Sequence, residues 1–430
     1  MTVTRREALI LGTTVLGASF GLAACTGGTG SSGEQKPIDT DGKLSGTVKF
    51  QTWSLKNERF TAYFENLISE FEKANPDVTI EWIDQPGDGY EEKILQQANS
   101  GTLPDVINIP PEFAMTLAQS GLLVDIAQAH PEIIDVYVPG GIKGYTYEDP
   151  AGSFGFPWYL GTTVNFWNTK LLEEGGVDTS HLPMSDQEYE AAALTMVENG
   201  ASAKLVDSMP TFQTFVNAGV ELYKDGEFVF NTPEAAAVVD RYAELYAKGA
   251  MVPEALTGSG EAKAPLFPSQ KTAYTSGTGS TAIQLREDAP TIYENLAVTK
   301  SWGTPPLLLQ GISVSANASA PEAAMAFAEF VTNNENQVEF VKIAKGFMPG
   351  TKEGNANPES FLSDIEDPFE KKTMELAAES MATAENIRPI LFTQTLETYF
   401  NQQMALAVKG DISGQEALDR IVQHCNDSIK

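Results

Sequence analysis

The sequence predicts an α/β protein, and three observations support that prediction. Its 430 residues, 42% of them hydrophobic, are more than one ordinary domain holds, so two domains or two halves of an interrupted domain are expected. Short apolar runs typical of strands alternate with segments whose apolar residues have helical spacing. Several later segments open with residues that favour helix starts. This alternation predicts mostly parallel sheets with helices on their faces.

The first elements can be placed from residue 47 onward. The apolar pattern predicts strands at 47–53, 78–83 and 105–109, and helices at 58–74, 90–99 and 112–118. The apolar residues from Phe60 to Phe71 have the spacing of a helix face that packs against a core, and Trp167 is also assigned to the core.

Later helices are marked by their starting residues. A Ser three residues before a Glu has the spacing of a capping box, in which each side chain satisfies a free backbone N–H. This pattern occurs at Ser185, Ser319 and Ser413, and Pro233 stands at a predicted first helical position. From residue 367 to the C-terminus the pattern is almost entirely helical.

The first residues are typical of an export signal. Thr4-Arg5-Arg6 opens a basic segment, and the uncharged run that follows is short and Gly-broken for a membrane span. The run ends in Leu22-Ala23-Ala24-Cys25, which resembles the box of bacterial lipoproteins, whose Cys receives a diacylglycerol. An ordinary cleavage site with a chance Cys is the alternative. We predict a signal peptide at 1–24, lipidation of Cys25 and a flexible Gly/Ser-rich tether at 25–45.

The charge balance argues against several classes of partner. With 58 acidic and 28 basic residues the formal charge is −30, so phosphate backbones and anionic lipid surfaces are repelled, and no nucleic acid partner is expected. Three His and two Cys are too few for a zinc ribbon or a disulfide framework, and neither a metal nor a cofactor is predicted, although cation sites built from carboxylates alone stay open. With Cys25 acylated, Cys425 has no partner and is expected to be half-buried on a helix.

Common catalytic motifs are missing from the sequence. It has no Gly-x-Ser-x-Gly elbow, no Ser-x-x-Lys pair and no His-Glu-x-x-His. Gly277-x-Gly279-x-x-Ala282 is similar to a dinucleotide fingerprint, but it lies far from the first strand–helix unit, so a tight turn is the better interpretation. Neighbouring acids such as Glu91-Glu92 are expected by chance among 58. The protein is therefore predicted not to be an enzyme.

Six short segments, in order along nearly the whole chain after residue 46, resemble those of one known family. They are 71–76 (FEKANP), 101–106 (GTLPDV), 118–123 (AQSGLL), 154–157 (FGFP) with 165–168 (NFWN), 313–315 (SVS) before a capped helix, and 410–413 (GDIS) with 416–418 (EAL). On these segments the chain resembles the carbohydrate-binding subunits of ABC importers, the maltose-binding-protein-like group of extracellular solute-binding proteins. Their shared order makes the resemblance specific.

The resemblance implies a periplasmic-binding-protein-like fold of two α/β lobes, joined by hinge crossings, with the ligand in the cleft between them. By the family pattern the first lobe takes residues 46–155 and 303–342, and the second takes 156–302 and 343–430. It further implies that the protein captures a sugar or oligosaccharide on the outer face of the cell membrane and delivers it to the permease subunits of an ABC importer. A monomer, anchored by lipid at Cys25, is expected.

Candidate ligand contacts follow from the chemistry of sugars. A pyranose has an apolar face and a rim of hydroxyls, so its site needs flat aromatic rings together with polar side chains. In parallel sheets ligands bind beyond the carboxyl ends of strands. The candidates are Trp53 and Asp84 at strand ends, Trp158 and Tyr159 at the predicted crossing, and, from the resemblance, Glu112, Phe212 and Arg388.

Other functions stay open on the sequence alone. A binding protein for a non-sugar solute such as a polyamine would suit the clustered carboxylates. An exported glycan hydrolase would use two carboxylates, and a sensor or adhesion lipoprotein would use the same fold without a permease. At Gly279-Ser280 the chain also departs from the family, in which many members carry a Trp, so one ring of an aromatic sandwich is missing.

Overall fold

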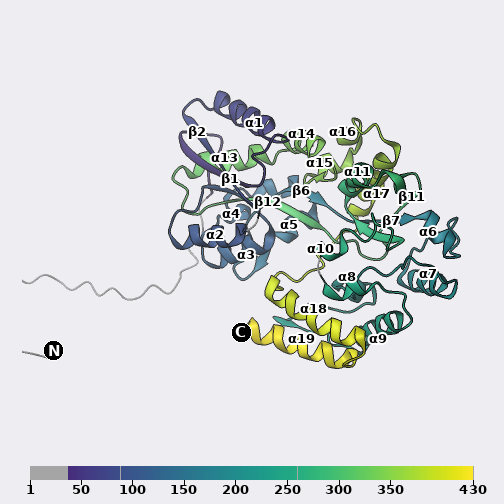
Figure 1. Ribbon diagram of the computed structural model, residues 1–430. Helices are drawn as coiled ribbons and strands as arrows, with labels where there is room; N and C mark the ends of the chain where they lie inside the picture. Colours follow the sequence, from purple (N-terminus) through teal and green to yellow (C-terminus); the bar gives the residue numbers. More distant parts are fainter. Residues whose placement is uncertain (1–36, 88, 259, 430) are drawn as a thin grey trace, which may run out of the picture. The chain divides into compact units, whose positions relative to one another are not determined.

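The computed structural model describes residues 37–429 except 88 and 259 (Figure 1). The predicted signal peptide, Cys25 and most of the predicted tether lie outside the described residues. Among the helices formed by the described residues, none combines the length and the apolar character needed to cross a membrane.

The six elements predicted for the first region are all present. They are β1 (Gly46–Trp53), α1 (Thr61–Ala74), β2 (Val78–Gln85), α2 (Tyr90–Asn99), β3 (Val106–Ile109) and α3 (Pro111–Gln119). Helix α1 buries Phe64, Leu67 and Phe71 on one face, as their spacing predicts. It begins three residues later than expected, because Phe60 is its N-cap and not part of its first turn.

The middle of the chain is a series of shorter elements. In order these are α4 (Ile126–Ala129), η1 (Pro131–Val136), α5 (Pro139–Gly144), β4 (Thr146–Glu148), β5 (Ala151–Ser153), β6 (Phe156–Gly161), β7 (Val164–Asn168), α6 (Thr169–Glu174), α7 (Asp186–Glu198), α8 (Phe212–Asn217), β8 (Tyr223–Lys224), β9 (Glu227–Phe228), α9 (Pro233–Ala247), η2 (Pro253–Thr257), α10 (Gly260–Lys263), β10 (Tyr274–Gly277), α11 (Gly279–Asp288), α12 (Pro290–Tyr293), β11 (Leu296–Lys300) and β12 (Leu308–Val314).

The remaining chain is mainly helical, as predicted. It forms α13 (Pro321–Val331), α14 (Asn334–Ile343), β13 (Met348–Pro349), α15 (Lys352–Ala356), α16 (Glu359–Leu362), α17 (Pro368–Met381), α18 (Gln394–Lys409) and α19 (Gly414–Ser428). Helices α18 and α19 pack against each other and against α9 (Figure 1). A segment without regular structure, residues 382–393, separates α17 from α18.

Three of the four predicted helix starts are confirmed. Ser185 and Ser413 accept hydrogen bonds from backbone N–H groups three residues later, at 3.2 and 3.1 Å, and Pro233 is the first residue of α9. The prediction at Ser319 is wrong, since α13 starts at Pro321 with no side-chain cap. Pro favours the first helical position, and here it places the helix start two residues after Ser319.

The main sheet has six strands in the order β13-β6-β12-β3-β1-β2. Strand β1 pairs in parallel with β2 and β3, the arrangement that strand–helix–strand units produce. Strand β12 is antiparallel to β3 and β6, and β13 is antiparallel to β6. The expectation of mostly parallel sheets is therefore wrong beyond β1–β3, because the later strands enter the sheet from distant segments and not through a single crossover helix.

A second sheet has three antiparallel strands in the order β10-β7-β11. Residues 162–163 join β6 to β7 and so lead from the first sheet to the second, and residues 301–307 join β11 to β12 in return. These two links lie side by side, since Ser301 Oγ donates a hydrogen bond to the Thr163 carbonyl oxygen at 3.0 Å.

Two strands lie in a different sheet from the one that the lobe boundaries predict. Strands β6 and β13 pair within the six-stranded sheet, whereas residues 156–302 and 343–430 were expected in the second lobe. The family pattern starts the second lobe at residue 156, yet residues 156–161 form β6, in which Pro157 lies next to a bulge where the strand pairs with Gln310 and Gly311 of β12. A bulge accommodates a Pro within a strand. The link to the second sheet therefore begins at residue 162, several residues later than the predicted boundary.

The burial of Trp167 and Cys425 can be compared with the expectation for each residue. Trp167 is fully buried, in an apolar cluster with residues of α9, α18 and α19, as the sequence predicts. Cys425 on α19 is fully buried where half-burial was expected. Burial raises the pKa of the Cys425 thiol to about 12, so the thiol stays protonated at neutral pH.

Candidate functional site

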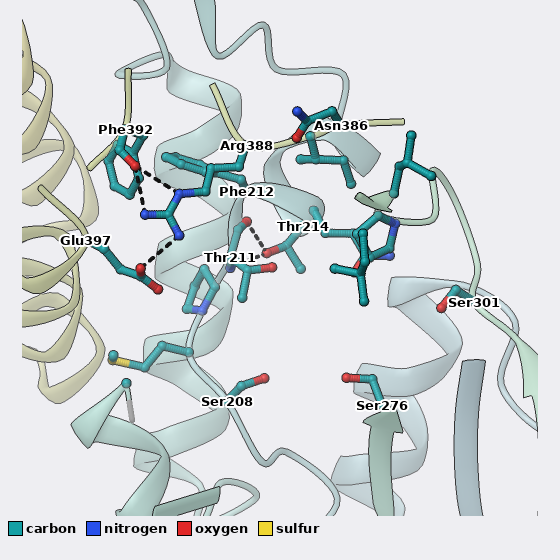
Figure 2. A pocket seen from close by; sticks show the side chains of 18 of the residues that line it. Ser208, Thr211, Phe212, Thr214, Ser276, Ser301, Asn386, Arg388, Phe392 and Glu397 are labelled. Carbon is teal, nitrogen blue, oxygen red and sulfur yellow. Dashed lines mark hydrogen bonds and ion pairs between the residues drawn. The ribbon is translucent and has the colours of Figure 1, made fainter. Parts of the chain in front are cut away.

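A cavity of about 950 Å³ is lined by residues from both sheets and from the link between β11 and β12. This volume lies at the upper end of protein ligand sites, which span roughly 300–1,000 Å³. The lining residues come from the ends of β1 and β3, from β6, β7, β10 and β12, from α8 and the loop before it, and from residues 386–392. Others come from α3, α7, α9, η2, α10 and α18. Figure 2 shows part of the cavity, including Ser208, Ser276 and Ser301.

On the six-stranded sheet, an aromatic ring stands beside a carboxylate. Trp53 ends β1 and is half-buried, with its ring centroid 5.2 Å from that of Tyr90 and 6.4 Å from that of Phe113. Glu112 is exposed in the first turn of α3, whose first residue is Pro111. Because β1 and β3 are parallel neighbours, their carboxyl ends meet at one edge and bring Trp53 and Glu112 to the same cavity.

Two neighbouring residues of β6 have different surroundings. Tyr159 lines the cavity, and its ring lies 5.0 Å from that of Phe347. Trp158 is fully buried, is stacked on Phe340 at 4.7 Å and is not one of the described residues that line the cavity. The two rings lie 5.0 Å apart and both pack against Phe340, so what separates them is burial: Tyr159 reaches the cavity, whereas Trp158 is enclosed in the core.

Asp84 is also absent from the described lining residues. Its Oδ1 accepts hydrogen bonds from Thr52 Oγ1 at 2.7 Å and from the Leu55 N–H at 2.9 Å. Thr52 lies directly opposite Asp84 in the parallel register of β1 and β2. The carboxylate therefore holds the Thr52 side chain before Trp53 and the Leu55 backbone after it.

On the other side of the cavity, α8 carries Phe212. The Thr211 N–H donates to Thr214 Oγ1 at 2.7 Å, and that hydroxyl donates to the Thr211 carbonyl oxygen at 2.7 Å, which closes the helix start (Figure 2). The half-buried Phe212 ring lies edge-on to Phe392 at 4.6 Å and to Phe400 at 5.3 Å. Other rings thus hold Phe212 in place at the cavity.

Arg388 lines the cavity, but the protein itself binds its guanidinium (Figure 2). Its Nε and Nη2 donate to the Phe392 carbonyl oxygen at 2.9 and 2.7 Å, and Nη1 donates to Glu397 Oε2 at 2.9 Å. These bonds tie the segment between α17 and α18 to the first turn of α18. The arrangement favours a role in holding this segment over a role in donating to a ligand.

Several lining residues were not predicted from the sequence. Trp302 stands half-buried in the link between β11 and β12, and its Nε1 donates to Asp186 Oδ1 at 2.9 Å. Lys263 pairs with the fully buried carboxylate of Asp207 at 3.0 Å. For Trp302 the sequence did offer one signal, because this Trp stands in a segment with Gly and Pro between two strands. Asp207 and Lys263 carry no such signal, because folding alone brings them together.

The charged groups of the cavity are mostly carboxylates. Among the described lining residues the acids are Glu112, Asp186, Asp207, Glu254 and Glu397, and the cations are Lys263 and Arg388. Each of the two cations is paired with one of these acids, so an anionic ligand meets a cavity of net negative charge.

Three further tyrosines line the cavity, and two of their hydroxyls already donate within the protein, Tyr189 to the Leu205 carbonyl oxygen at 2.9 Å and Tyr274 to Asn165 Oδ1 at 3.1 Å. Burial raises the pKa of three lining tyrosines, Tyr189, Tyr242 and Tyr274, so their hydroxyls stay protonated at neutral pH. In the described part of the chain, no group of three His, Cys, Asp or Glu side chains is placed to hold a metal ion.

The fold and the cavity define a class of bacterial binding protein. The profile of the family described as bacterial extracellular solute-binding protein matches residues 66–366, and the chain belongs to this family. The resemblance found in the sequence and the periplasmic-binding-protein-like fold are thereby confirmed.

Individual relatives are distant in sequence but similar in fold. YcjN of Escherichia coli K12, described as a candidate periplasmic-binding protein of an ABC transporter, is 23% identical over 330 residues, which are 71% of this chain and 73% of YcjN. A candidate oligosaccharide periplasmic-binding protein of Synechococcus sp. MITs9220 has a TM-score of 0.79 at 23% identity, covering 89% of this chain and 98% of that chain. The cyclic α-maltosyl-1,6-maltose binding protein of Arthrobacter globiformis has a TM-score of 0.73 at 21% identity, covering 90% and 100%.

Proposed function

We propose that the protein captures a neutral sugar or oligosaccharide in the cavity and delivers it to the permease subunits of an ABC importer. The observation that carries this proposal is the lining of the cavity, where aromatic rings stand among hydroxyl, amide and carboxylate groups. Rings match the apolar face of a pyranose, and the polar groups match its hydroxyl rim. The names of the Synechococcus and Arthrobacter neighbours support the same class of ligand.

The proposed ligand contacts are the predicted residues that line the cavity. They are Trp53, Glu112, Tyr159 and Phe212. Arg388 and Asp84 support them through the backbone, and Trp158 supports them from the core. The paired state of both lining cations leads us to expect weaker binding of sugars that carry a carboxylate or a phosphate.

The two lobes are proposed to close on the ligand by a hinge motion. The links at residues 162–163 and 301–307, which connect the two sheets, are the natural crossings. This assignment moves β6 and β13 into the first lobe. Closure requires that the ligand bind the closed state better than the open one, and contacts from both sheets provide that difference.

The protein is further proposed to act as a monomeric lipoprotein that catalyses no reaction. Membership of a family of extracellular binding proteins supports export and binding, and the Cys25 segment of the sequence supports the anchor. Replacing Cys25 by Ser should release the protein from the membrane fraction into the medium or periplasm. A variant that stays with the membrane would contradict the anchor and leave the binding function untouched.

A thermal-shift screen of residues 26–430 tests the ligand class. The panel holds neutral mono- and oligosaccharides, uronic acids, amino acids and polyamines. A ligand at one hundred times its Kd should add about 2.7 kcal/mol to the free energy of unfolding, which raises the Tm of a protein of this size by a few degrees. Stabilisation by a polyamine alone would replace the sugar proposal, and hydrolysis of glycans without stabilisation would replace the transport proposal.

A further inference from the structure

Trp302 has a placement that the proposed ligand contacts do not explain. It lies in the link between β11 and β12, directly after Ser301, which Figure 2 shows at the cavity. Its ring centroid is 5.5 Å from that of Tyr189, 6.0 Å from that of Tyr274 and 6.3 Å from that of Trp167. The ring is nevertheless half-buried and lines the cavity, so these three rings support it without covering it.

The indole is oriented by a hydrogen bond as well as by packing. Trp302 Nε1 donates to Asp186 Oδ1 at 2.9 Å. Asp186 is the first residue of α7, and the position of that helix start is fixed because Ser185 caps it. A hydrogen bond to a charged acceptor is stronger than a neutral one, so this contact restricts rotation of the ring.

The backbone after Trp302 is fixed by α8. The Thr304 N–H donates to Asn217 Oδ1 at 3.1 Å, and Gln213 Nε2 donates to the Thr304 carbonyl oxygen at 3.3 Å. Gly303 has a φ of +68°, and a Cβ at that position would collide with the Asn217 side chain. Glycine adopts this backbone conformation without strain. The turn at Gly303 therefore helps to fix the position of Trp302 at the cavity.

We propose that Trp302 is a stacking residue for the sugar, positioned by Asp186, and that it lets the ligand contact the link between the two sheets directly. The proposal rests on the proposed function, since it assumes a ligand with an apolar C–H face. A ring supported on three other rings and oriented by a carboxylate loses little freedom when it binds, which makes it an efficient platform. Asp186 is a positioning residue, because its Oδ1 is used by the indole.

The test uses the full chain, purified from membranes in detergent and titrated with maltotriose, isomaltotriose and arabinotriose. Affinity is measured by calorimetry with the tightest of the three. Trp302→Ala should weaken binding about tenfold, the effect of losing one stacked ring. Trp302→Phe should bind within about threefold of the wild type, because a flat ring remains. Binding of the tightest sugar by Trp302→Ala at wild-type affinity would overturn the proposal and leave the proposed function intact.

Fluorescence provides a second readout that a purely structural role would not change. The wild type should show a change of tryptophan emission on sugar addition. Trp302→Phe should lose part of that change, the remainder coming from Trp53, while Trp82→Phe should keep all of it. Trp82 is a half-buried ring whose Nε1 donates to Thr52, and it lies away from the described cavity lining. If Trp302→Ala does not fold, Trp302→Phe and Trp82→Phe still test the proposal. An emission change as large as that of the wild type in Trp302→Phe would overturn it.

Asp186 is tested by substitution and rescue. Asp186→Ala should weaken binding about threefold and alter the emission spectrum of the free protein, because the indole loses its acceptor. Asp186→Asn should restore both, since its amide oxygen still accepts the bond. Equal behaviour of the two variants would refute the positioning role. Failure of the wild type to bind any of the three sugars would instead count against the proposed function itself.

Discussion

The two sides of the cavity are built by different means. On the six-stranded sheet, Trp53 and Glu112 follow parallel strands whose carboxyl ends meet at one edge, so local strand–helix order already brings them together. On the other side, Phe212 and Trp302 stand on a short helix and a link, held by rings and side chains from distant parts of the sequence. The comparison teaches that a regular topology places functional residues predictably, whereas irregular segments depend on their tertiary partners.

The largest effect on stability is expected from Trp158, which was predicted to contact the ligand but lies in the core. Trp158→Ala should lower the free energy of unfolding by about 4 kcal/mol, because it empties a fully buried space beside Phe340 and Phe64. Chemical denaturation measures this loss. Trp158→Phe should recover most of the stability, since it refills much of the space and removes an indole N–H that has no hydrogen-bond partner among the described residues. A stable Trp158→Ala variant with lost sugar binding would place Trp158 at the site after all.

The next effect concerns the ion pair at the cavity. Lys263→Met leaves the carboxylate of Asp207 buried without its 3.0 Å partner, and we expect a loss of about 2 kcal/mol in stability, since Lys263 is partly exposed. Lys271→Met is the matched control: it breaks the exposed 2.7 Å pair with Glu254 and should cost less than about 1 kcal/mol. Equal denaturation midpoints for the two variants would show that burial of Asp207 contributes little.

A third prediction compares Trp53 on one side of the cavity with Phe212 on the other, by the effect of each on affinity and Tm. Trp53→Ala should weaken sugar binding about tenfold, or about 1.4 kcal/mol, with little loss of stability, because the ring is half-buried at a strand end. Phe212→Ala should lower both affinity and Tm, because Phe212 also packs against Phe392 and Phe400. Calorimetry and thermal melts of both variants check this. A large drop in Tm for Trp53→Ala would mean that the two sides do not differ in this way.

The smallest effect is expected at Arg388. Arg388→Gln removes the ion pair with Glu397 and the bonds to the Phe392 carbonyl oxygen. The pair is half-exposed, so we expect a stability loss of less than about 1 kcal/mol and sugar affinity close to that of the wild type. Glu397→Gln serves as the control from the partner side. A strong loss of affinity in Arg388→Gln alone would show that the guanidinium reaches the ligand.

Much of the regular framework was predictable because its signals are local. Apolar spacing placed β1, α1, β2, α2, β3 and α3 to within a few residues, and Ser–x–x–Glu spacing marked two later helix starts. The order of six short segments also identified the family. The direction of the later strands was harder to predict. Strand β12 is antiparallel to β3 because of the path by which the chain re-enters the sheet, and its own residues do not reveal that path.

By itself, the sequence determined the class of fold, the family, the strand end that carries Trp53 and the helix start that carries Glu112. The tertiary structure decided which of two adjacent residues reaches the cavity, Tyr159 and not Trp158, because packing against Phe340 of α14 encloses Trp158 completely. It also decided that Arg388 donates to the Phe392 carbonyl oxygen and that Trp302 donates to Asp186. Contacts between segments distant in sequence leave no pattern along the chain, and folding alone brings their atoms within hydrogen-bonding distance.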